Sequence, residues 1–272
     1  MTDGSANQEA VPPAAAAAPA ADASPALALV IANLTTTIDD EVFAAAVAAV
    51  SLQVSRDFQP EWGAAATISA TRLSLEGGKA AIDSAAGAII YVGDSAADPT
   101  TGTAGVFGYH SDTLGQTPYG FIYLDVCRQY NEAWTCTLSH EVLELLADPA
   151  TALNVSGPAP PVEGGPAETV SYGLEVCDPT QGDTYAIDAV TVANFVTRAY
   201  FGMTGGTSAT NFLGLPLDSF GVRPGGYVQY QDAGGPQQIN GSRIDALRLA
   251  ARAVLANHRR NARRVARPTG ET

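Results

Sequence analysis

The stretch NEAWTCTLSHEVLELLADP, residues 131–149, is the most informative segment of this chain. With about 100° of rotation per residue in a helix, Glu144 and Asp148 fall within about 80° of His140, and Glu141 lies about 100° away. The opposite side of such a helix is apolar and contains Leu138, Val142, Leu143, Leu145 and Leu146. The segment therefore predicts an amphipathic helix over residues 131–149.

The polar face of this helix has two interpretations. Most such faces lie in solvent while the leucines pack on a core. Here, however, carboxylates three and four residues apart repel one another by about 0.2–0.5 kcal/mol per pair, and the segment contains no lysine or arginine. His140 also stands one turn from Glu144, so the two side chains can share one ion. The residues leave both a solvated face and a metal site open, and the uncompensated charge favours the metal site.

The residues HEVLE, 140–144, resemble the H-E-x-x-H helix of zincin metallopeptidases, in which two histidines hold zinc and the glutamate activates water. The expected order of elements is also similar: strand, long helix, strands, a glycine-containing edge strand at Tyr119–Val126, then the helix. SHEVLELLADP and EVCDP (175–179) resemble stretches of uncharacterised bacterial and phage-encoded proteins of metallopeptidase type. The resemblance covers about residues 27–230. It implies an α+β, zincin-like fold with a twisted mixed sheet and an active-site helix.

The resemblance also implies roles for individual residues. His140 and Glu144 would be metal ligands and Glu141 the general base. Glu144 stands where the zincin motif has its second histidine, and because a carboxylate is a harder ligand, calcium and magnesium become candidates beside zinc. A downstream glutamate completes the site in one zincin clan, which makes Glu175 the expected third ligand. A plain strand-end acid before Pro179 is an equally good interpretation of Glu175.

Three further residues are candidate ligands: Asp148, Asp178 and His110. Asp148 precedes Pro149, so ending the helix is its simpler role. His110 is expected on a long loop before the edge strand, as a ligand or a substrate contact. Met203 falls where a metzincin Met-turn would lie, although a single methionine is usually core filler.

The rest of the chain extends outward from this helix. Before it, strands are predicted at Leu27–Leu34, Ala66–Leu75 and Gly87–Val92, with a helix that Thr37 caps and Pro60 closes, and a loop over Asp94–Pro118. The apolar stripe of the helix is formed by Phe43, Val47, Val50, Val54 and Phe58. After the central helix, we expect a loop at Asn154–Glu168, a hairpin of Thr169–Cys177 with Asp183–Val190, a short helix at Val190–Phe201 and little regular structure over Gly202–Gly241.

Three parts follow from composition. Residues 1–26 are an Ala/Pro-rich leader without apolar periodicity, and 242–272 are expected to form a basic C-terminal helix and tail; residues 27–241, with a Gly/Pro-rich C-terminal half, correspond to the domain that the resemblance implies is zincin-like. Eight of the 14 basic residues but only two of the 28 acids follow Gly241, so the tail carries about +6 and the rest about −20. An acidic body disfavours nucleic acid and suits cations, which leaves the tail as the one nucleic-acid candidate. The tail is better explained by packing on the acidic body of its own or a neighbouring chain, which would allow self-association.

The function that these patterns favour is a divalent-metal-dependent hydrolase, peptidase-like, acting on a peptide or protein substrate. The alternative is a non-catalytic structural or binding protein on a degenerate zincin scaffold. The chain lacks a G-x-x-x-x-G-K-[ST] loop and a G-x-S-x-G elbow, and a thiol nucleophile at Cys136 beside His140 is disfavoured because such pairs usually come from separate elements. No membrane span or secretory signal is expected, and three cysteines are too few for a disulfide framework. The cytoplasm is the expected location.

Overall fold

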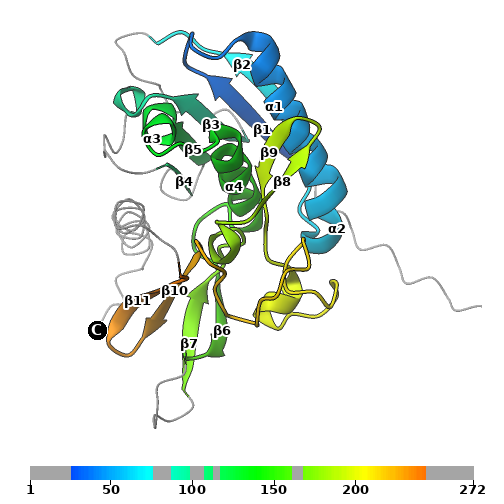
Figure 1. The fold of residues 1–272 in the computed structure, drawn as a ribbon, viewed down its shortest axis with the longest axis vertical. Helices are drawn as coiled ribbons and strands as arrows, with labels where there is room; N and C mark the ends of the chain where they lie inside the picture. The colour runs from blue at the N-terminus through cyan, green and yellow to red at the C-terminus, as the bar shows by residue number, and fades with distance from the viewer. Residues whose placement is uncertain (1–25, 76–86, 99–106, 113–116, 161–167, 243–272) are drawn as a thin grey trace, which may run out of the picture.

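The computed structural model describes residues 26–75, 87–98, 107–112, 117–160 and 168–242 of the chain. These residues form a mixed α and β structure with a five-stranded sheet, a four-stranded sheet and a separate two-stranded hairpin (Figure 1). The leader and the basic C-terminal helix expected from the sequence lie outside the described residues. Within the described part of the chain, no helix is both long enough and apolar enough to cross a membrane.

The five-stranded sheet has the strand order β2-β1-β3-β5-β4. Its strands are β1 (Leu27–Asn33), β2 (Ala66–Arg72), β3 (Ala88–Gly93), β4 (Gly108–Asp112) and β5 (Pro118–Tyr123). Strands β2, β1, β3 and β5 run parallel to one another, whereas β4 runs antiparallel to β5 at the edge. Every residue of β3 is buried, as is typical of a central strand covered on both faces. The three predicted strands before the loop are thus confirmed, with ends shifted by one to three residues.

The edge of this sheet differs from the prediction. Tyr119–Val126 was expected to be the edge strand, but β5 lies between β3 and β4 and gives way at Leu124 to a short helix, α3 (Leu124–Gln129). The true edge strand, β4, falls inside the segment Asp94–Pro118 that was predicted to be a loop. Its five residues, GYHSD, carry too few apolar side chains to give a strand signal of their own.

The long helix after β1 consists of three helical segments. Helix α1 (Asp40–Leu52) continues through a π-helical segment (Gln53–Phe58) into α2 (Gln59–Trp62). The predicted apolar stripe from Phe43 to Phe58 is buried throughout, which confirms the helical periodicity. Pro60 does not close the helix as predicted, because it lies in the first turn of α2, where its missing N–H is tolerated. The helix ends at Gly63, whose φ of 72° supplies the left-handed C-terminal conformation.

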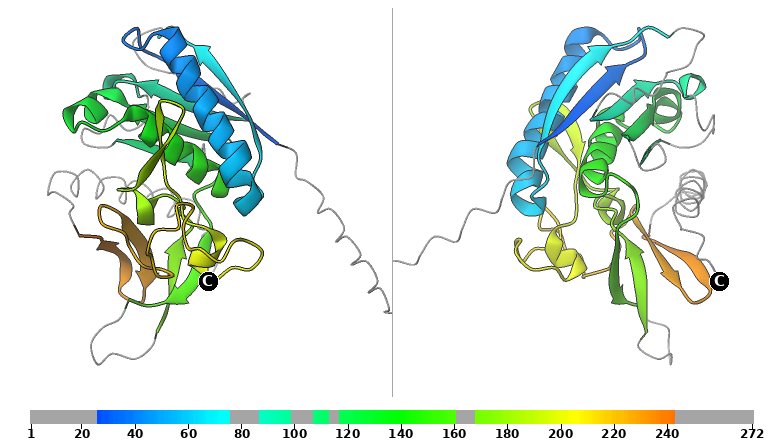
Figure 2. Two further views of the ribbon diagram at one scale, coloured as in Figure 1. Left: turned by 45° about the vertical axis from the view of Figure 1, so that its right-hand side comes forward. Right: turned by 180° about the vertical axis from the view of Figure 1, so that it is seen from behind.

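The informative segment at residues 131–149 forms helix α4 (Trp134–Ala147). Helix α1 packs on β2, α4 packs on β4 and β5, and the two helices contact each other on one face of the sheet (Figures 1 and 2). The interpretation of the polar face of α4 as a solvated surface is wrong, since His140, Glu141 and Glu144 are only 6%, 3% and 0% exposed. Helix α4 is therefore covered on its charged side as well as on its leucine side.

The second half of the described chain covers this charged side. It contains β6 (Asn154–Pro158), β7 (Thr169–Gly173), β8 (Thr184–Ile187), β9 (Val190–Ala193), β10 (Tyr227–Asp232) and β11 (Gly235–Asn240). Strands β11-β10-β7-β6 form an antiparallel sheet below the first one (Figure 1). The second half of the described chain also contains two 3₁₀ turns, at Asp178–Thr180 and Arg198–Phe201. The strand β6 forms within the predicted loop at Asn154–Glu168.

Three predictions in this half are wrong. Thr169–Cys177 and Asp183–Val190 do not pair with each other, because β7 pairs with β6 and β10, and β8 pairs with β9. The segment from Val190, which was expected to begin a helix, forms strand β9. Asp188, at a φ of 51°, allows a tight turn that folds β9 back on β8. The Gly-rich stretch over Gly202–Gly241 contains the β10–β11 hairpin, whose turn is formed by Ala233 and Gly234.

The β8–β9 hairpin holds α1 and α4 in place. The Nε2 of Gln53, in the π-helical segment, donates to the carbonyl of Ala193 at 2.8 Å. The backbone N–H of the same Ala193 donates to Oγ of Ser139 in α4, also at 2.8 Å. Both side chains are buried, so these bonds are shielded from water. The hairpin thereby fixes the position of the helix that carries the candidate site.

Candidate metal centre

Helix α4 presents His140, Glu141 and Glu144 to the interior of the protein. Its other side buries Leu138, Val142, Leu143 and Leu145, each 0% exposed, and this packing fixes the rotation of the helix about its axis. With the leucines buried in the hydrophobic core, the charged side faces Asp178, which follows β7, and His110 of the edge strand β4. The core packing of α4 therefore decides where its polar groups point.

The first group of polar atoms lies around Nε2 of His140. Oε2 of Glu144 is 3.2 Å from this nitrogen, and Oδ1 of Asp178 is also 3.2 Å away. The three ligand-type atoms all lie within 4.8 Å of one another, and all three side chains are buried. In a tetrahedral zinc site with bonds of about 2.0–2.1 Å, ligand atoms are about 3.3–3.4 Å apart. The two distances from Nε2 of His140 are close to this value and so fit a divalent ion held by the three atoms.

Asp178 reaches α4 because the segment after β7 is tied to the helix and to the chain beyond it. The backbone N–H of Cys177 donates to Oε1 of Glu144 at 3.2 Å. The hydroxyl of Thr180, one turn on, donates to the carbonyls of Cys177 and Asn194. These contacts set both the 3₁₀ turn that carries Asp178 and the orientation of the Glu144 carboxylate.

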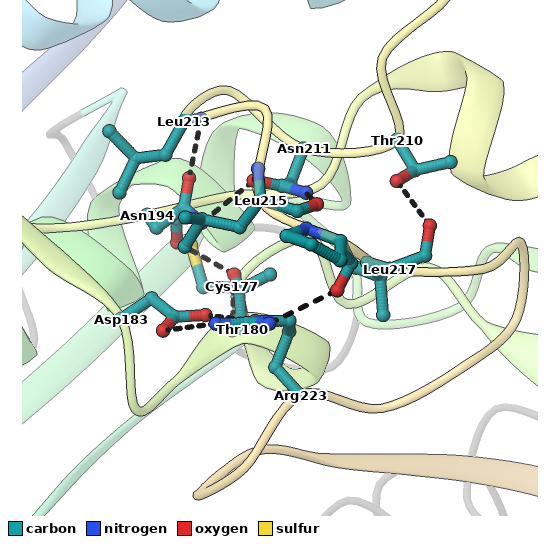
Figure 3. Close-up of polar contacts among 11 residues, drawn as sticks. Cys177, Thr180, Asp183, Asn194, Thr210, Asn211, Leu213, Leu215, Leu217 and Arg223 are labelled. Carbon is teal, nitrogen blue, oxygen red and sulfur yellow. Dashed lines mark hydrogen bonds and ion pairs between the residues drawn. The ribbon is translucent and has the colours of Figure 1, made fainter.

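A network of polar contacts, with Asn194 and Asn211 buried and Asp183 and Arg223 partly exposed, braces this segment (Figure 3). The side-chain amide of Asn194 donates to Oδ1 of Asn211 at 3.2 Å, and Asn211 in turn holds the backbone of Leu215 through both its Oδ1 and its Nδ2. Arg223 donates to both carboxylate oxygens of Asp183, at 2.8 and 3.2 Å. The bond between Asn194 and Asn211 helps to fix one arrangement, because breaking it would leave buried polar groups unsatisfied.

The second group of polar atoms lies around His110. Nδ1 of His110 is 3.1 Å from Oε2 of Glu141 and 3.8 Å from Oε2 of Glu144. His110, expected on a loop, lies in β4 opposite Gly120 of β5. A Cβ at Gly120 would come within 2.7 Å of the carbonyl oxygen of Tyr109, so glycine permits this close strand pairing. The sheet edge therefore delivers His110 to α4.

The surroundings of His140 favour its charged form when no ion is bound. Burial alone would lower the pKa of His140, but the negative charge of Glu144 and the hydrogen bonds to Asp178 and Glu144 outweigh it. The pKa of His140 is therefore raised well above its usual 6.5. A proton on His140 and a metal ion would compete for the same carboxylates.

The three cysteines are free and buried, and burial makes their thiols unreactive. Burial raises the pKa of the Cys127 thiol to about 12 and raises the pKa values of Cys136 and Cys177 as well. The thiolate is the nucleophilic form, and burial removes it at neutral pH. A thiol nucleophile at Cys136 beside His140 is thus disfavoured on physical grounds.

Two of the candidate ligands, Asp148 and Glu175, lie outside both groups of ligand-type atoms. Oδ1 and Oδ2 of Asp148 accept the backbone N–H groups of Ala152 and Leu153, at 3.0 and 2.8 Å, so this carboxylate ends α4 and caps the following turn. Glu175 is buried, at 4% exposure, but belongs to neither group of ligand-type atoms. Met203 is partly buried against the core. The geometry places Asp178, rather than Glu175, beside His140 and Glu144.

A small pocket leads to the centre. It has a volume of about 20 Å³ and reaches both His140 and Glu141; its other lining residues are Phe107, Gly108, Glu132, Cys136, Thr137 and Gln181. A space of this size holds about one water molecule. Sequence reasoning did not identify Gln181 or the segment at Phe107–Gly108 as neighbours of the site, and no motif marks them. The pocket gives one small molecule access to the face that His140 and Glu141 share.

The donor set suits a range of divalent ions. One imidazole nitrogen and two carboxylate oxygens can bind zinc, and carboxylate-rich sets also accept harder ions such as magnesium, calcium or manganese. The chain matches no known family model, and no curated protein or solved structure is significantly similar to it.

Proposed function

We propose that this protein is a divalent-metal-dependent hydrolase, peptidase-like, with His140, Glu144 and Asp178 as metal ligands and Glu141 as general base. The observation that carries the proposal is the gathering of these side chains. Nε2 of His140 lies 3.2 Å from a carboxylate oxygen of both Glu144 and Asp178, and a pocket reaches His140 and Glu141 together. One ligand, His140, and the candidate base, Glu141, thus border the same pocket, and Glu144 and Asp178 lie behind His140.

The order of elements supports a zincin-like scaffold for this site. Strand β1, the long helix α1 and strands β2 and β3 precede the site helix in the expected order, although the antiparallel edge strand β4 comes before β5 and the short helix α3 lies between β5 and α4. The resemblance of HEVLE to H-E-x-x-H adds to this support, although Glu144 replaces the second histidine.

The chemistry assigns a separate role to each side chain. A divalent ion bound there would act as a Lewis acid, lowering the pKa of water and polarising a carbonyl group. His140, Glu144 and Asp178 would hold it, and the Cys177 N–H fixes the Glu144 carboxylate. Glu141 would accept a proton from the attacking water as its oxygen bonds to the carbonyl carbon. Glu141 would then return the proton to the leaving nitrogen as the C–N bond breaks.

A peptide substrate is supported by the position of β4. This strand lies at the edge of the sheet and carries His110 toward Glu141. Edge strands bind extended peptides by adding a strand, with main-chain hydrogen bonds providing affinity. A peptide beside β4 would pass close to the pocket that Gly108 lines.

Metal analysis of protein purified without chelators and without a histidine tag tests the proposal. We expect at least one divalent ion per chain, and His140→Ala should abolish binding at the position shared with Glu144 and Asp178. His258→Ala changes the third histidine of the chain and serves as the matched control. Native protein that contains no ion and shows no thermal shift with zinc, calcium, magnesium or manganese would refute the site.

A non-catalytic structural ion is the second candidate, because the centre is deeply buried and its pocket holds about one water molecule. The two candidates differ in whether the ion keeps an open coordination position. Cobalt-substituted protein should change its visible spectrum on addition of a small hydroxamate if a position is open. An unchanged spectrum would favour the structural role.

A further inference from the structure

The two groups of ligand-type atoms share one carboxylate oxygen. Oε2 of Glu144 lies 3.2 Å from Nε2 of His140 and 3.8 Å from Nδ1 of His110. We propose that the centre has a second divalent-ion position, held by His110, Glu141 and Glu144, beside the position held by His140, Glu144 and Asp178. Glu144 would then bridge two ions.

The geometry around His110 supports this position. Its Nδ1 is 3.1 Å from Oε2 of Glu141, close to the spacing of about 3.3–3.4 Å between two ligands of one tetrahedral ion. Oε1 of Glu144 is held by the Cys177 N–H, and Oε2 of the same carboxylate is near both histidines. Ions that share ligands in two-metal sites are about 3.5–4 Å apart.

The charge of the two groups supports two ions rather than one. With both histidines neutral, Glu141, Glu144 and Asp178 bring three formal negative charges into a buried space. One divalent ion leaves this set with a net charge of −1. Two divalent ions with one bound hydroxide bring it to neutrality, which removes the cost of burying net charge.

The burial and hydrogen bonding of His110 are an independent observation, and they predict which of the two metal positions is occupied first. His110 is 1% exposed, and its Nδ1 faces two carboxylates. A second ion on Nδ1 would leave the ring proton on Nε2, which has no hydrogen-bond partner among the described residues. Metal-bound histidines usually donate this proton to a partner, and loss of the partner weakens metal binding about 10–100-fold. The second ion should therefore bind more weakly than the first.

A second ion would also change the chemistry of the first. Because it engages Oε2 of Glu141, it withdraws the general base, so excess metal should inhibit hydrolysis. This consequence rests on the proposed function, whereas the number of ions bound does not require any activity.

The test is a titration of chelator-treated full-length protein with zinc, followed by equilibrium dialysis and metal analysis. Wild type should bind two ions per chain, with dissociation constants about 10–100-fold apart. His110→Phe keeps a planar ring without a ligand atom and should bind one ion with the tighter constant. Glu175→Gln changes a buried carboxylate outside both groups and should still bind two.

The outcomes separate this proposal from the proposed function. One ion in wild type would overturn the second position and leave the first intact, whereas no ion would refute both. If His110→Phe does not fold, judged by its near-UV circular dichroism, manganese-loaded wild type decides. An exchange-coupled electron paramagnetic resonance signal is expected for ions that share Glu144, and two uncoupled ions would overturn the proposal.

Discussion

Replacing Asp178 by asparagine should remove most of the thermal stabilisation that a divalent ion gives to this protein. Oδ1 of Asp178 lies 3.2 Å from Nε2 of His140, and the side chain is 1% exposed. Asparagine has nearly the same shape, so the substitution removes the negative charge while leaving the packing in place. Glu175→Gln makes the same change of charge three residues earlier, at a buried position outside both groups of ligand atoms.

The size of the effect follows from binding linkage. An ion at 100 times its dissociation constant stabilises the folded state by about 2.7 kcal/mol. Since about 1 kcal/mol shifts the melting temperature by about 2–4 °C in a domain of about 150–250 residues, wild type should gain about 5–11 °C. Loss of a charged ligand should weaken binding at least about 100-fold, which at the same ion concentration leaves about 0.4 kcal/mol, or about 1–2 °C.

Differential scanning calorimetry of chelator-treated protein, with and without added zinc or manganese, measures these shifts. Wild type and Glu175→Gln should both gain several degrees, and Asp178→Asn should gain little. An undiminished shift in Asp178→Asn, together with its loss in Glu175→Gln, would refute the assignment and make Glu175 the third ligand.

Four further predictions test other parts of the structure. In ion-free protein, the pKa of His140 is higher in the folded state than in the unfolded state, so protonation of His140 stabilises the fold. This stabilisation is fully present below about pH 6.5 and is lost as the pH rises through the folded-state pKa. The melting temperature should therefore fall over that window in wild type but not in His140→Gln. Glu141→Gln should retain the first ion and lose hydrolysis of a fluorogenic peptide library; retained turnover would exclude Glu141 as the base. Ser139→Ala leaves the N–H of Ala193 without its acceptor and should lower the free energy of unfolding by about 1–3 kcal/mol in denaturant titrations, and a change below about 0.5 kcal/mol would mean that the hairpin does not depend on this bond. Deletion of residues 1–26 should leave the melting temperature unchanged, and a fall of several degrees would show that they pack on the rest of the chain.

Local sequence patterns predicted the elements that carry strong periodicity. The stripe from Phe43 to Phe58 and the run at Leu27–Leu34 gave α1 and β1 because burial of one face, or of both faces, leaves a clear apolar pattern. Short polar strands left no such pattern. The five residues of β4 form a strand because β5 offers them hydrogen-bonding partners, which no property of GYHSD reveals.

Two of the missed hairpins did have local signals. Asp188 and Ala189 connect β8 to β9, and Ala233 and Gly234 connect β10 to β11, both as two-residue turns. Aspartate and glycine are the residues that adopt such turns most readily. Weak alternation in the flanking strands concealed the first turn near the end of the expected strand Asp183–Val190 and the second within an expected irregular stretch.

The sequence by itself determined that His140, Glu141 and Glu144 lie on one side of a helix, because the helical repeat relates residues three and four apart without reference to the rest of the chain. Only the tertiary structure decided that this side is buried, since burial depends on the second half of the chain folding over α4. It also decided that Asp178 and His110 meet this face while Asp148 caps a turn. Asp178 arrives through a turn held by Cys177 and Thr180, and His110 through pairing of β4 with β5. The contacts of His140 with Asp178 and of His110 with Glu144 join residues more than 30 positions apart, and no spacing within the chain encodes which of several acids will complete the site.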